Sequence, residues 1–537
     1  MASSRPDRVP SDRAASPVAR GAAEDGLSFA VATDAPVLER WQADVVEALH
    51  ARGFAIERWL HAGAAQPSPA AHAVALELIA PEDVPASLPQ PAAMRNGDQF
   101  PPVDVLLDLT RAGVEPGVRT HAGATWAFSF GREAASDPVS AAMRAIVRGP
   151  APMPVALRAM PGGDVLRSGV IRTTSGSLST QLDRLLLEPA TWPAQVARER
   201  LVATGHLASP IPKGAAPAAT PATPATEFPA IPMPLLRLGV AGREALTAAG
   251  SLVRHTEWSV GHVRRPIEGW LDDGSTPAVS WLPHRPGRYA ADPFGIEVGD
   301  ATHVLFEDFD QRRTRGVISA ATIDAHGIWS EPEIVLDTRS HASYPYLVQT
   351  DGETWLIPET SDVAEVRLYR ALELPHRWTL EARLLEQTHV SDATVVRHQG
   401  RWWMFGTSRG RGVDEALRIW HAPALTGPWQ PHELDPVKID ARSARPGGTP
   451  FVRDGVLYRP AQDCSIRYGG RLAINRVEVL DERRFAEAPI RFVEPIPAFP
   501  DGLHTLSAAG SASLIDGNRT RFVAAALRAQ LGARLRR

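Results

Sequence analysis

The sequence holds one cysteine, Cys464, which excludes an intramolecular disulfide and a zinc site built from several cysteines. Lysine is nearly absent, and a formal charge of -4 gives no basic field for a nucleic acid. No apolar run is long enough to cross a membrane. Residues 1–26 are polar and lack the apolar centre of a secretory signal. These absences predict a cytoplasmic protein without a membrane span and without a nucleic-acid partner.

The 537 residues exceed what one hydrophobic core usually serves, so we expect more than one domain. A run of proline, alanine and threonine without packing residues predicts a semi-stiff linker that sets the boundary. The predicted organisation is a disordered tail (1–26), an α/β domain (27–205), the linker (206–234), an all-β domain (235–525) and a basic tail (526–537).

Short apolar runs alternate with helical patterns in the first domain. Residues 27–33 fit a buried strand, and residues 35–52 carry apolar side chains at helical spacing before the stop signal of Gly53. Further apolar runs at 54–60, 73–79 and 103–109 fit additional strands. Strands that alternate with helices predict a doubly wound, Rossmann-type α/β fold.

This order of elements resembles the amino-terminal domain of formyltransferases, and Gly162-Gly163-Asp164-Val165-Leu166 resembles a turn of that family. The family's catalytic Asn-x-His-Pro-Ser is replaced by Trp126-Ala127-Phe128-Ser129, and Pro161 follows Met160 where the family has an aspartate. The resemblance therefore implies a degenerate, inactive domain. An N-formyltransferase with displaced catalytic residues, in which the loop residue His121 replaces the base, is the alternative.

A β-hairpin with an aromatic second strand recurs in the second domain. The clearest copy spans residues 391–407, with a tight turn at Gln399-Gly400. Similar turns stand at Asp300, Asp351, Asp454 and Asp516, at intervals of roughly 50 to 60 residues. Five copies at blade length predict a five-bladed β-propeller. An early strand at 258–263 is expected to complete one blade with the last repeat, and the basic stretch 519–537 to form a terminal helix.

Polar residues stand just before the first strand of each repeat. Equivalent residues of successive blades face one central funnel, so we expect these side chains to converge there. They are Asp292, Tyr344, Asp392, Arg445 and His504. For a single aspartate, capping of a turn is the simpler explanation, but recurrence at one blade position favours a polar funnel.

Both the hairpins and the funnel residues resemble the five-bladed propellers of family-43-type glycoside hydrolases. The resemblance implies that Asp292 is the general base and Asp392 the carboxylate that orients the substrate. The family's general acid, a glutamate, is replaced by Arg445, whose guanidinium is always charged and cannot donate the proton. Glu359, after the aromatic strand of the second blade, is a candidate substitute acid.

Residues 258–522 are also similar to the propeller domain of plant glucosamine inositolphosphorylceramide transferases, and to bacterial proteins that join this propeller to a formyltransferase-like domain. Phrases that carry the resemblance are Ala291-Asp292-Pro293-Phe294, Ser343-Tyr344-Pro345, Ile357-Pro358-Glu359-Thr360 and Leu503-His504-Thr505-Leu506-Ser507. They indicate fold and family more than reaction.

Two further residues are assigned to the funnel as substrate-binding candidates. Glu307 follows the aromatic strand of the first blade, and Asp463 ends the equivalent strand of the fourth. Arg445 is expected either to clamp a phosphate or carboxylate of the ligand or to form a structural ion pair with Asp463. Cys464 is expected to be a buried apolar residue rather than a nucleophile.

The sequence thus predicts a carbohydrate-active protein that forms or breaks a glycosidic bond, by hydrolysis, transfer or phosphorolysis. Its expected partner is a carbohydrate or nucleotide-sugar ligand, and no cofactor or metal is expected. The alternative is a non-catalytic module that binds a glycan or a protein.

Overall fold

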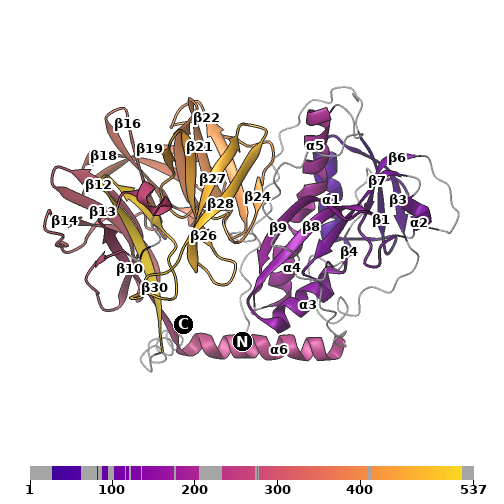
Figure 1. Cartoon of the computed structure of the whole chain (residues 1–537), viewed down its shortest axis with the longest axis horizontal. Coiled ribbons are helices and arrows are strands. Elements are labelled where there is room, and N and C mark those ends of the chain that lie inside the picture. Colours follow the sequence, from indigo (N-terminus) through magenta and orange to yellow (C-terminus); the bar gives the residue numbers. More distant parts are fainter. Residues whose placement is uncertain are drawn as a thin grey trace.

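The computed structural model describes residues 27–61, 81–82, 88–94, 102–114, 116–119, 122–132, 134, 136–174, 177–204, 233–272, 275, 277–408 and 414–522. The predicted tails (1–26 and 526–537), the strand at 73–79, His121 and linker residues 206–232 lie outside the described residues. The chain forms an α/β part (27–253) and a propeller (254–522), which lie side by side in Figure 1.

The α/β part is built on a seven-stranded mixed sheet. The order is β5 (Ala92–Ala93), β3 (Ala55–His61), β1 (Ser28–Thr33), β6 (Val103–Asp108), β7 (Ala122–Phe130), β8 (Pro152–Met160) and β9 (Asp164–Arg172). The first five strands run parallel, whereas β8 and β9 are antiparallel additions at one edge. A small antiparallel pair, β2 (Leu38–Glu39) and β4 (Pro81–Glu82), stands apart.

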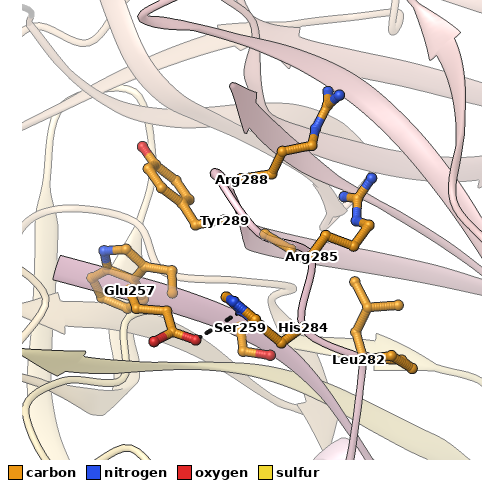
Figure 2. A pocket seen from close by; sticks show the side chains of 10 residues that line it. Glu257, Ser259, Leu282, His284, Arg285, Arg288 and Tyr289 are labelled. Carbon is orange, nitrogen blue, oxygen red and sulfur yellow. Dashed lines mark ion pairs between the residues drawn. The ribbon is translucent and has the colours of Figure 1, made fainter. Parts of the chain in front are cut away.

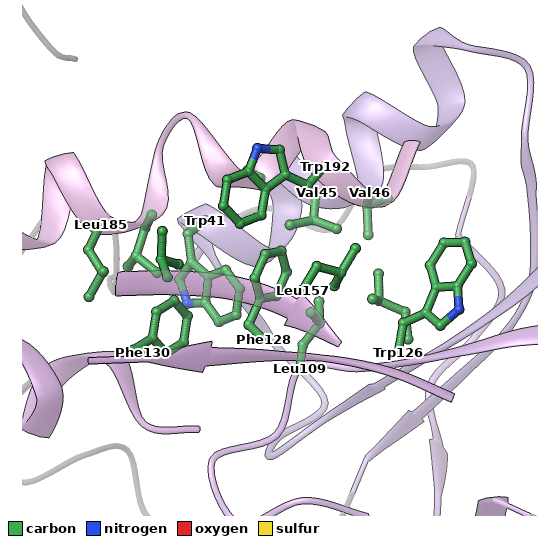
Figure 3. Packing of buried hydrophobic residues seen from close by; sticks show 14 of the residues in the cluster. Trp41, Val45, Val46, Leu109, Trp126, Phe128, Phe130, Leu157, Leu185 and Trp192 are labelled. Carbon is green, nitrogen blue, oxygen red and sulfur yellow. The ribbon is translucent and has the colours of Figure 1, made fainter. Parts of the chain in front are cut away.

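Helices pack on this sheet through apolar side chains. They are α1 (Arg40–Ala51), α2 (Pro116–Arg119), α3 (Pro138–Arg148), α4 (Leu178–Leu186) and α5 (Trp192–Thr204), with a 3₁₀ turn at Pro189–Thr191. Figure 3 shows Trp126, Phe128 and Phe130 of β7 within one buried cluster with Trp41 of α1 and Trp192 of α5. The segment compared with the formyltransferase site is therefore core, and its bulky apolar residues are used for packing. The mixed sheet with helices is present, while the likeness to formyltransferases stays a prediction.

A long helix precedes the propeller where the sequence predicted strands from residue 235. Helix α6 (Met233–Val253) packs on α3, and Val240 joins the core of the α/β part. Arg243 of α6 donates to the Val147 carbonyl at 3.3 Å. In Figure 1, α6 runs from beneath α3 to the start of β10. Periodicity failed here because several apolar residues of α6 are exposed, which blurs the 3.6-residue pattern. Within the described residues, no helix is long and apolar enough to cross a membrane.

The second part is a five-bladed propeller, as the hairpin repeats predicted. The first two blades are β12 (Arg288–Val298), β13 (Ala301–Asp310), β14 (Arg315–Ile323) and β15 (Glu333–Leu336), then β16 (Ser343–Thr350), β17 (Glu353–Glu359), β18 (Val366–Glu373) and β19 (Arg377–Leu385). The third is β20 (Val390–His398), β21 (Arg401–Ser408), β22 (Ala416–Ala422) and β23 (Gln430–Pro431), with β24 (Lys438–Ile439) also on β22. The fourth is β25 (Phe451–Arg453), β26 (Val456–Asp463), β27 (Arg471–Leu480) and β28 (Phe485–Val493).

The fifth blade joins the two ends of the propeller, as expected. It contains β11 (Ser280–Trp281), β10 (Arg254–Val263), β30 (Ala512–Phe522) and β29 (Leu506–Ala509), and β10 pairs with β30 along its whole length. Because the first and last strands are neighbours, the ring closes through main-chain hydrogen bonds. Short 3₁₀ turns occur at Ile267–Leu271 and Ser361–Val363.

The fifth hairpin was placed wrongly from the sequence. Its turn lies at Gly510-Ser511, and Asp516-Gly517 stands in the middle of β30. A Cβ atom on Gly517 would lie 2.7 Å from Cβ of Phe499, so this glycine permits close packing rather than a turn. The terminal helix predicted from residue 519 is also wrong for residues 519–522, which continue β30.

Candidate active site

Three successive blades place a polar residue in the same strained backbone conformation. Asp292, Tyr344 and Asp392 have φ values of 52°, 44° and 54°, and each lies at a β-bulge in the first strand of its blade. A positive φ is unfavourable for residues with a Cβ atom, and such strain concentrates at functional sites. The bulge turns these residues out of the regular strand pattern, and the main-chain N–H of Tyr344 comes within hydrogen-bond distance of Asp292.

Asp292 is held by groups from the second and the fifth blades. Its Oδ1 accepts from the Thr505 hydroxyl at 3.1 Å, and its Oδ2 accepts from the Tyr344 main-chain N–H at 3.3 Å. Nε2 of His504 lies 3.7 Å from Oδ1. Burial raises the pKa of Asp292, although the positive charge of His504 opposes the rise.

Asp392 is clamped by the fourth blade. Arg445 donates through Nε to Oδ2 of Asp392 at 2.6 Å, and Gln462 donates to the same oxygen at 2.8 Å. The main-chain N–H of Asp392 donates to Oε2 of Glu359 at 3.0 Å. Burial raises the pKa of Asp392 and Arg445 opposes the rise, while Asp292 and Glu359 add to it. The two aspartates predicted to face one funnel therefore belong to one electrostatic cluster.

Glu307 and Glu359, both buried, have opposite pKa shifts. Burial raises the pKa of Glu307 well above its usual value, and the charges of Asp292 and Glu359 add to the rise. Burial also acts to raise the pKa of Glu359, but Arg445 and hydrogen bonds from Ser361 and Asp392 outweigh it and lower the pKa. Glu307 therefore holds its proton to higher pH than an ordinary glutamic acid does, and Glu359 releases its proton at lower pH.

His504 and Asp516 form a buried pair behind Asp292. Nδ1 of His504 lies 2.5 Å from Oδ2 of Asp516, and the imidazole stacks on the Trp258 indole with ring centroids 3.9 Å apart. Burial lowers the pKa of His504, but Asp516 and Asp292 outweigh it and raise the pKa above its usual value. The imidazole therefore lies between two carboxyls and binds its proton more tightly than an ordinary histidine does.

Asp292, His504 and Asp516 bring ligand atoms within 4.8 Å of one another, a spacing that a metal ion tolerates. All four carboxylate oxygens already accept hydrogen bonds or an ion pair, from Thr505, His504 and the main chains of Asp292, Tyr344, His504 and Thr505. These donors would face a cation at close range, so the arrangement favours a hydrogen-bond network over a metal site.

Arg445 and Asp463 lie differently from what the sequence suggested. The predicted ion pair between them is wrong, because Arg445 contacts Asp392 and Asp414, whereas Asp463 pairs with Arg471 at 2.8 Å. Side chains alternate along β26, so the inward direction of Gln462 turns its neighbour Asp463 away. Asp463 also accepts from Ser465, as a turn-capping aspartate does. The structure therefore does not bring Asp463 to the funnel.

Aromatic side chains surround the carboxylates. Tyr289 stacks on Phe309 with centroids 4.7 Å apart, and the charges of Glu307 and Asp292 add to the rise that burial causes in the pKa of Tyr289. Tyr468 contacts His504 edge to face, and the Arg445 guanidinium lies 5.0 Å from its ring. Flat apolar faces beside buried carboxylates suit a sugar ring.

A pocket with a basic lining adjoins this site (Figure 2). Trp258 and Tyr289 line it together with His284, Arg285 and Arg288. Arg285 and Arg288 share Asp308 at 2.9 and 2.8 Å, and His284 pairs with Glu257 at 3.0 Å. Arg519 and Arg521 also approach Glu257, so five basic residues surround two carboxylates. This edge of the funnel has an excess of positive charge.

Sequence reasoning missed several residues that hold the site. They are Asp414, Gln462, Tyr289, Thr505 and Asp516. Asp516 was taken for a turn, and the others carry no local signal that separates them from ordinary strand residues. Cys464 is fully buried as expected, and burial raises the pKa of its thiol, which makes it a poor nucleophile.

Comparison with known proteins places a family match on the propeller. Residues 277–496 match the family described as glucosamine inositolphosphorylceramide transferase 1, N-terminal. The chain is 36% identical over 213 residues to glucosamine inositolphosphorylceramide transferase 1 of Arabidopsis thaliana, and 35% identical over 211 residues to that of Oryza sativa subsp. japonica. Each match covers 38% of this chain and 28% of the relative, so the similarity spans less than a third of the plant proteins.

Solved structures similar to this chain include a family 117 glycoside hydrolase of Zobellia galactanivorans, at 12% identity and a TM-score of 0.33. That match covers 49% of this chain and 89% of the hydrolase. The GH43 protein BlXynB of Bacillus licheniformis matches at 15% identity and a TM-score of 0.30, over 39% of this chain and 45% of that one. The family match and the plant relatives, and not these structures, show that the propeller is similar in sequence to the segment described as N-terminal in the plant transferases. The motifs of the propeller predicted this similarity.

Proposed function

We propose that the propeller funnel binds a carbohydrate and forms or breaks a glycosidic bond. The observation that carries the proposal is a cluster of buried carboxyls from three successive blades, in which the pKa is raised at one member and lowered at another; they are Asp292, Glu307, Glu359 and Asp392. Glycosidic chemistry needs a protonated carboxylic acid and an ionised carboxylate in the same cavity. The plant relatives are named as transferases of glucosamine, which supports a sugar as the ligand.

Glu307 is the proposed proton donor to the leaving oxygen. Burial and the neighbouring carboxyls raise its pKa, whereas the lowered pKa of Glu359 makes that residue unsuitable for the acid role suggested by the sequence. Glu359 instead accepts from Ser361 at 2.6 Å and from the Asp392 main chain, and provides a fixed negative charge.

Asp292 is the proposed base. Its raised pKa increases its basicity, and the Thr505 hydroxyl and the Tyr344 N–H fix the orientation of its carboxylate. It would take a proton from water in hydrolysis or from a sugar hydroxyl in transfer. Nε2 of His504 lies 3.7 Å from its Oδ1, and burial raises the pKa of the neighbouring Asp392 to about 8.

The ligand proposed here carries an anionic group, and the basic edge of the funnel is its proposed position. Arg445, the clamp suggested by the sequence, directs its nitrogens to Asp392 and Asp414. Arg285, Arg288 and His284 are more exposed and line a pocket beside Trp258. A sugar phosphate or nucleotide sugar would place its charge there, as in a transfer or phosphorolysis. The cytoplasmic location stays a prediction.

The test compares Glu307→Gln and Asp292→Asn with the parent chain, assayed against mixed glycans and nucleotide sugars. Each substitution keeps the shape of the side chain but removes the proton chemistry, so we expect turnover to fall by about 100-fold or more while ligand binding is retained. Glu331→Gln, on an exposed loop, is the control. A ligand bound by all four chains with no turnover in any of them would establish the non-catalytic binding module instead.

A further inference from the structure

The α/β part contacts the propeller along one sheet edge. The main-chain N–H of Ala441 donates to the Val170 carbonyl of β9 at 2.7 Å, next to β24 of the third blade. A Cβ atom on Gly169 would lie 2.4 Å from the Ile439 carbonyl oxygen, so only glycine allows this approach. Ile439 in turn packs into the core of the α/β part. The two parts are therefore packed together and not merely tethered.

Charged residues of the α/β part reach into the propeller beside this edge. Arg172 of β9 and Arg184 of α4 lie 3.5 and 3.4 Å from Oδ2 of Asp414, and Arg184 also pairs with Glu415. Asp414 and Glu415 are 4% and 1% exposed, so these two arginines compensate carboxyl groups that have little contact with water.

The other oxygen of Asp414 contacts the candidate active site. Nη1 of Arg445 lies 3.3 Å from Oδ1 of Asp414, while Nε and Nη2 of the same guanidinium hold Asp392 at 2.6 and 3.4 Å. An unbroken line of ion pairs thus runs from Arg184 through Asp414 and Arg445 to Asp392.

Arginines and carboxyls alternate along this line. Three guanidinium groups (Arg172, Arg184 and Arg445) face three buried carboxyls (Asp392, Asp414 and Glu415). Without Arg184, Asp414 and Glu415 have one cation fewer, and Arg445 is drawn toward Asp414. If the negative charge of Asp414 were removed, Arg445 would form an ion pair with Asp392 alone.

We propose that Arg184 and Asp414 are positioning residues of the funnel, through which the α/β part controls the charge and orientation of Asp392. The role of Asp392 in carbohydrate chemistry rests on the proposed function, whereas the ionic line does not. The α/β part would then act by holding Asp392 through the ionic line, which requires no catalytic residues of its own. Strand β7 agrees with this role, because its large side chains are apolar and packed in the core.

Arg184→Gln and Asp414→Asn in the full-length chain test the proposal. The readout is the titration of the Asp392 carboxyl carbon by NMR after ¹³C labelling of aspartate, with the resonance assigned by its loss in Asp392→Asn. Removing the cation of Arg184 should raise the midpoint, and removing the anion of Asp414 should lower it, each by about 0.5 pH unit or more. The other ionisable groups that act on Asp392 or respond to it stay unchanged: Asp292, Glu307, Tyr344, Glu359, Arg445, Tyr468 and His504.

Arg418→Gln is the matched control. Arg418 pairs with Glu188 across the same interface at 3.1 Å and is about as exposed as Arg184, yet none of its described contacts involves Asp414 or Arg445. We expect it to weaken the interface without moving the Asp392 midpoint.

Opposite shifts in the two variants, with none in the control, support the ionic line. Shifts in one direction for all three variants, or no shift in any, overturn it. Arg172→Gln should reproduce the upward shift if Arg184→Gln does not fold. Because the readout is a titration, it gives an answer even if the funnel proves to have no activity on glycosidic bonds.

Discussion

Nε of Arg445 lies 2.6 Å from Oδ2 of Asp392, across a gap of 53 residues that joins the third and fourth blades. Arginine occupies the position at which the sequence resemblance to family-43-type glycoside hydrolases predicted an acid, and its guanidinium binds a carboxyl group instead. The proposed function therefore assigns the proton-donor role to another buried carboxyl, Glu307, whose pKa is raised by burial and by the negative charges of its neighbours.

Arg445→Met should destabilise the propeller strongly. Methionine replaces the aliphatic part of the arginine side chain but not the guanidinium. Asp392 and Asp414 are then buried without their shared cation, which costs about 3–5 kcal/mol in comparable cases. Urea denaturation measures the free energy of unfolding. Arg313→Met, at an arginine whose side chain is 68% exposed, should change it by no more than about 0.5 kcal/mol. An equal effect of both substitutions would show that the Arg445 cluster contributes no net stability.

Glu307 should make the protein less stable as the pH rises. Its folded-state pKa is raised, so its contribution is fully present below the unfolded pKa and is lost as the pH rises toward and through the folded value. Glutamine mimics the protonated form, so the difference in unfolding free energy between Glu307→Gln and the parent should grow from about pH 5 upward. Thermal unfolding across pH 5–9 measures this. A flat difference curve would mean that Glu307 is ionised in the native state.

Local signals found the first four hairpins because each turn is made by its own residues. Asp351, Gln399 and Asp454 adopt φ values near 50° before a glycine, as tight turns between strands require. Asp516-Gly517 has the same local sequence but another use, since Gly517 makes room for Phe499 and Trp281. A dipeptide does not reveal which of the two uses applies, because the second depends on residues far away in the chain.

Part of the candidate site was predictable because it too has a signal in the local sequence. Asp292, Tyr344 and Asp392 recur at one blade position, and this periodicity is visible in the sequence. Asp414 and Asp516 were missed because their importance comes from partners in other elements, such as Arg184 and His504. The α/β sheet followed from strand and helix alternation, whereas the contact between β9 and β24 had no sequence signal beyond Gly169.

Gly169→Ala should loosen the contact between the two parts of the chain. The new methyl group would overlap the Ile439 carbonyl oxygen, so β9 and β24 must separate and the bond from Ala441 to Val170 must lengthen. We expect a loss of about 1–3 kcal/mol, visible as a lower midpoint in thermal unfolding. Gly242→Ala is the control, because no heavy atom lies within 4 Å of a Cβ atom there and alanine favours helix α6. Equal stability of both variants would contradict the observed packing.

Asp516→Asn should lower the pKa of His504 and destabilise the closing blade. Asp516 accepts from the main-chain N–H groups of Asp292, His504 and Thr505 and pairs with Nδ1 of His504. An amide cannot supply the negative charge, and its N–H₂ group would face donors, so we expect a loss of about 3–5 kcal/mol. The raised pKa of His504 means that its contribution is complete below the unfolded pKa and declines as the pH rises through the folded value. The variant should therefore lose most stability at acidic to neutral pH, and the imidazole proton resonances should titrate at lower pH.

Asp454→Asn, on an exposed turn whose conformation asparagine accepts, should leave both the stability and the His504 titration unchanged. If His504 titrates at the same pH in the Asp516→Asn variant and the parent, Asp516 does not hold the imidazole in its charged form, and the charge opposite Asp292 must have another source.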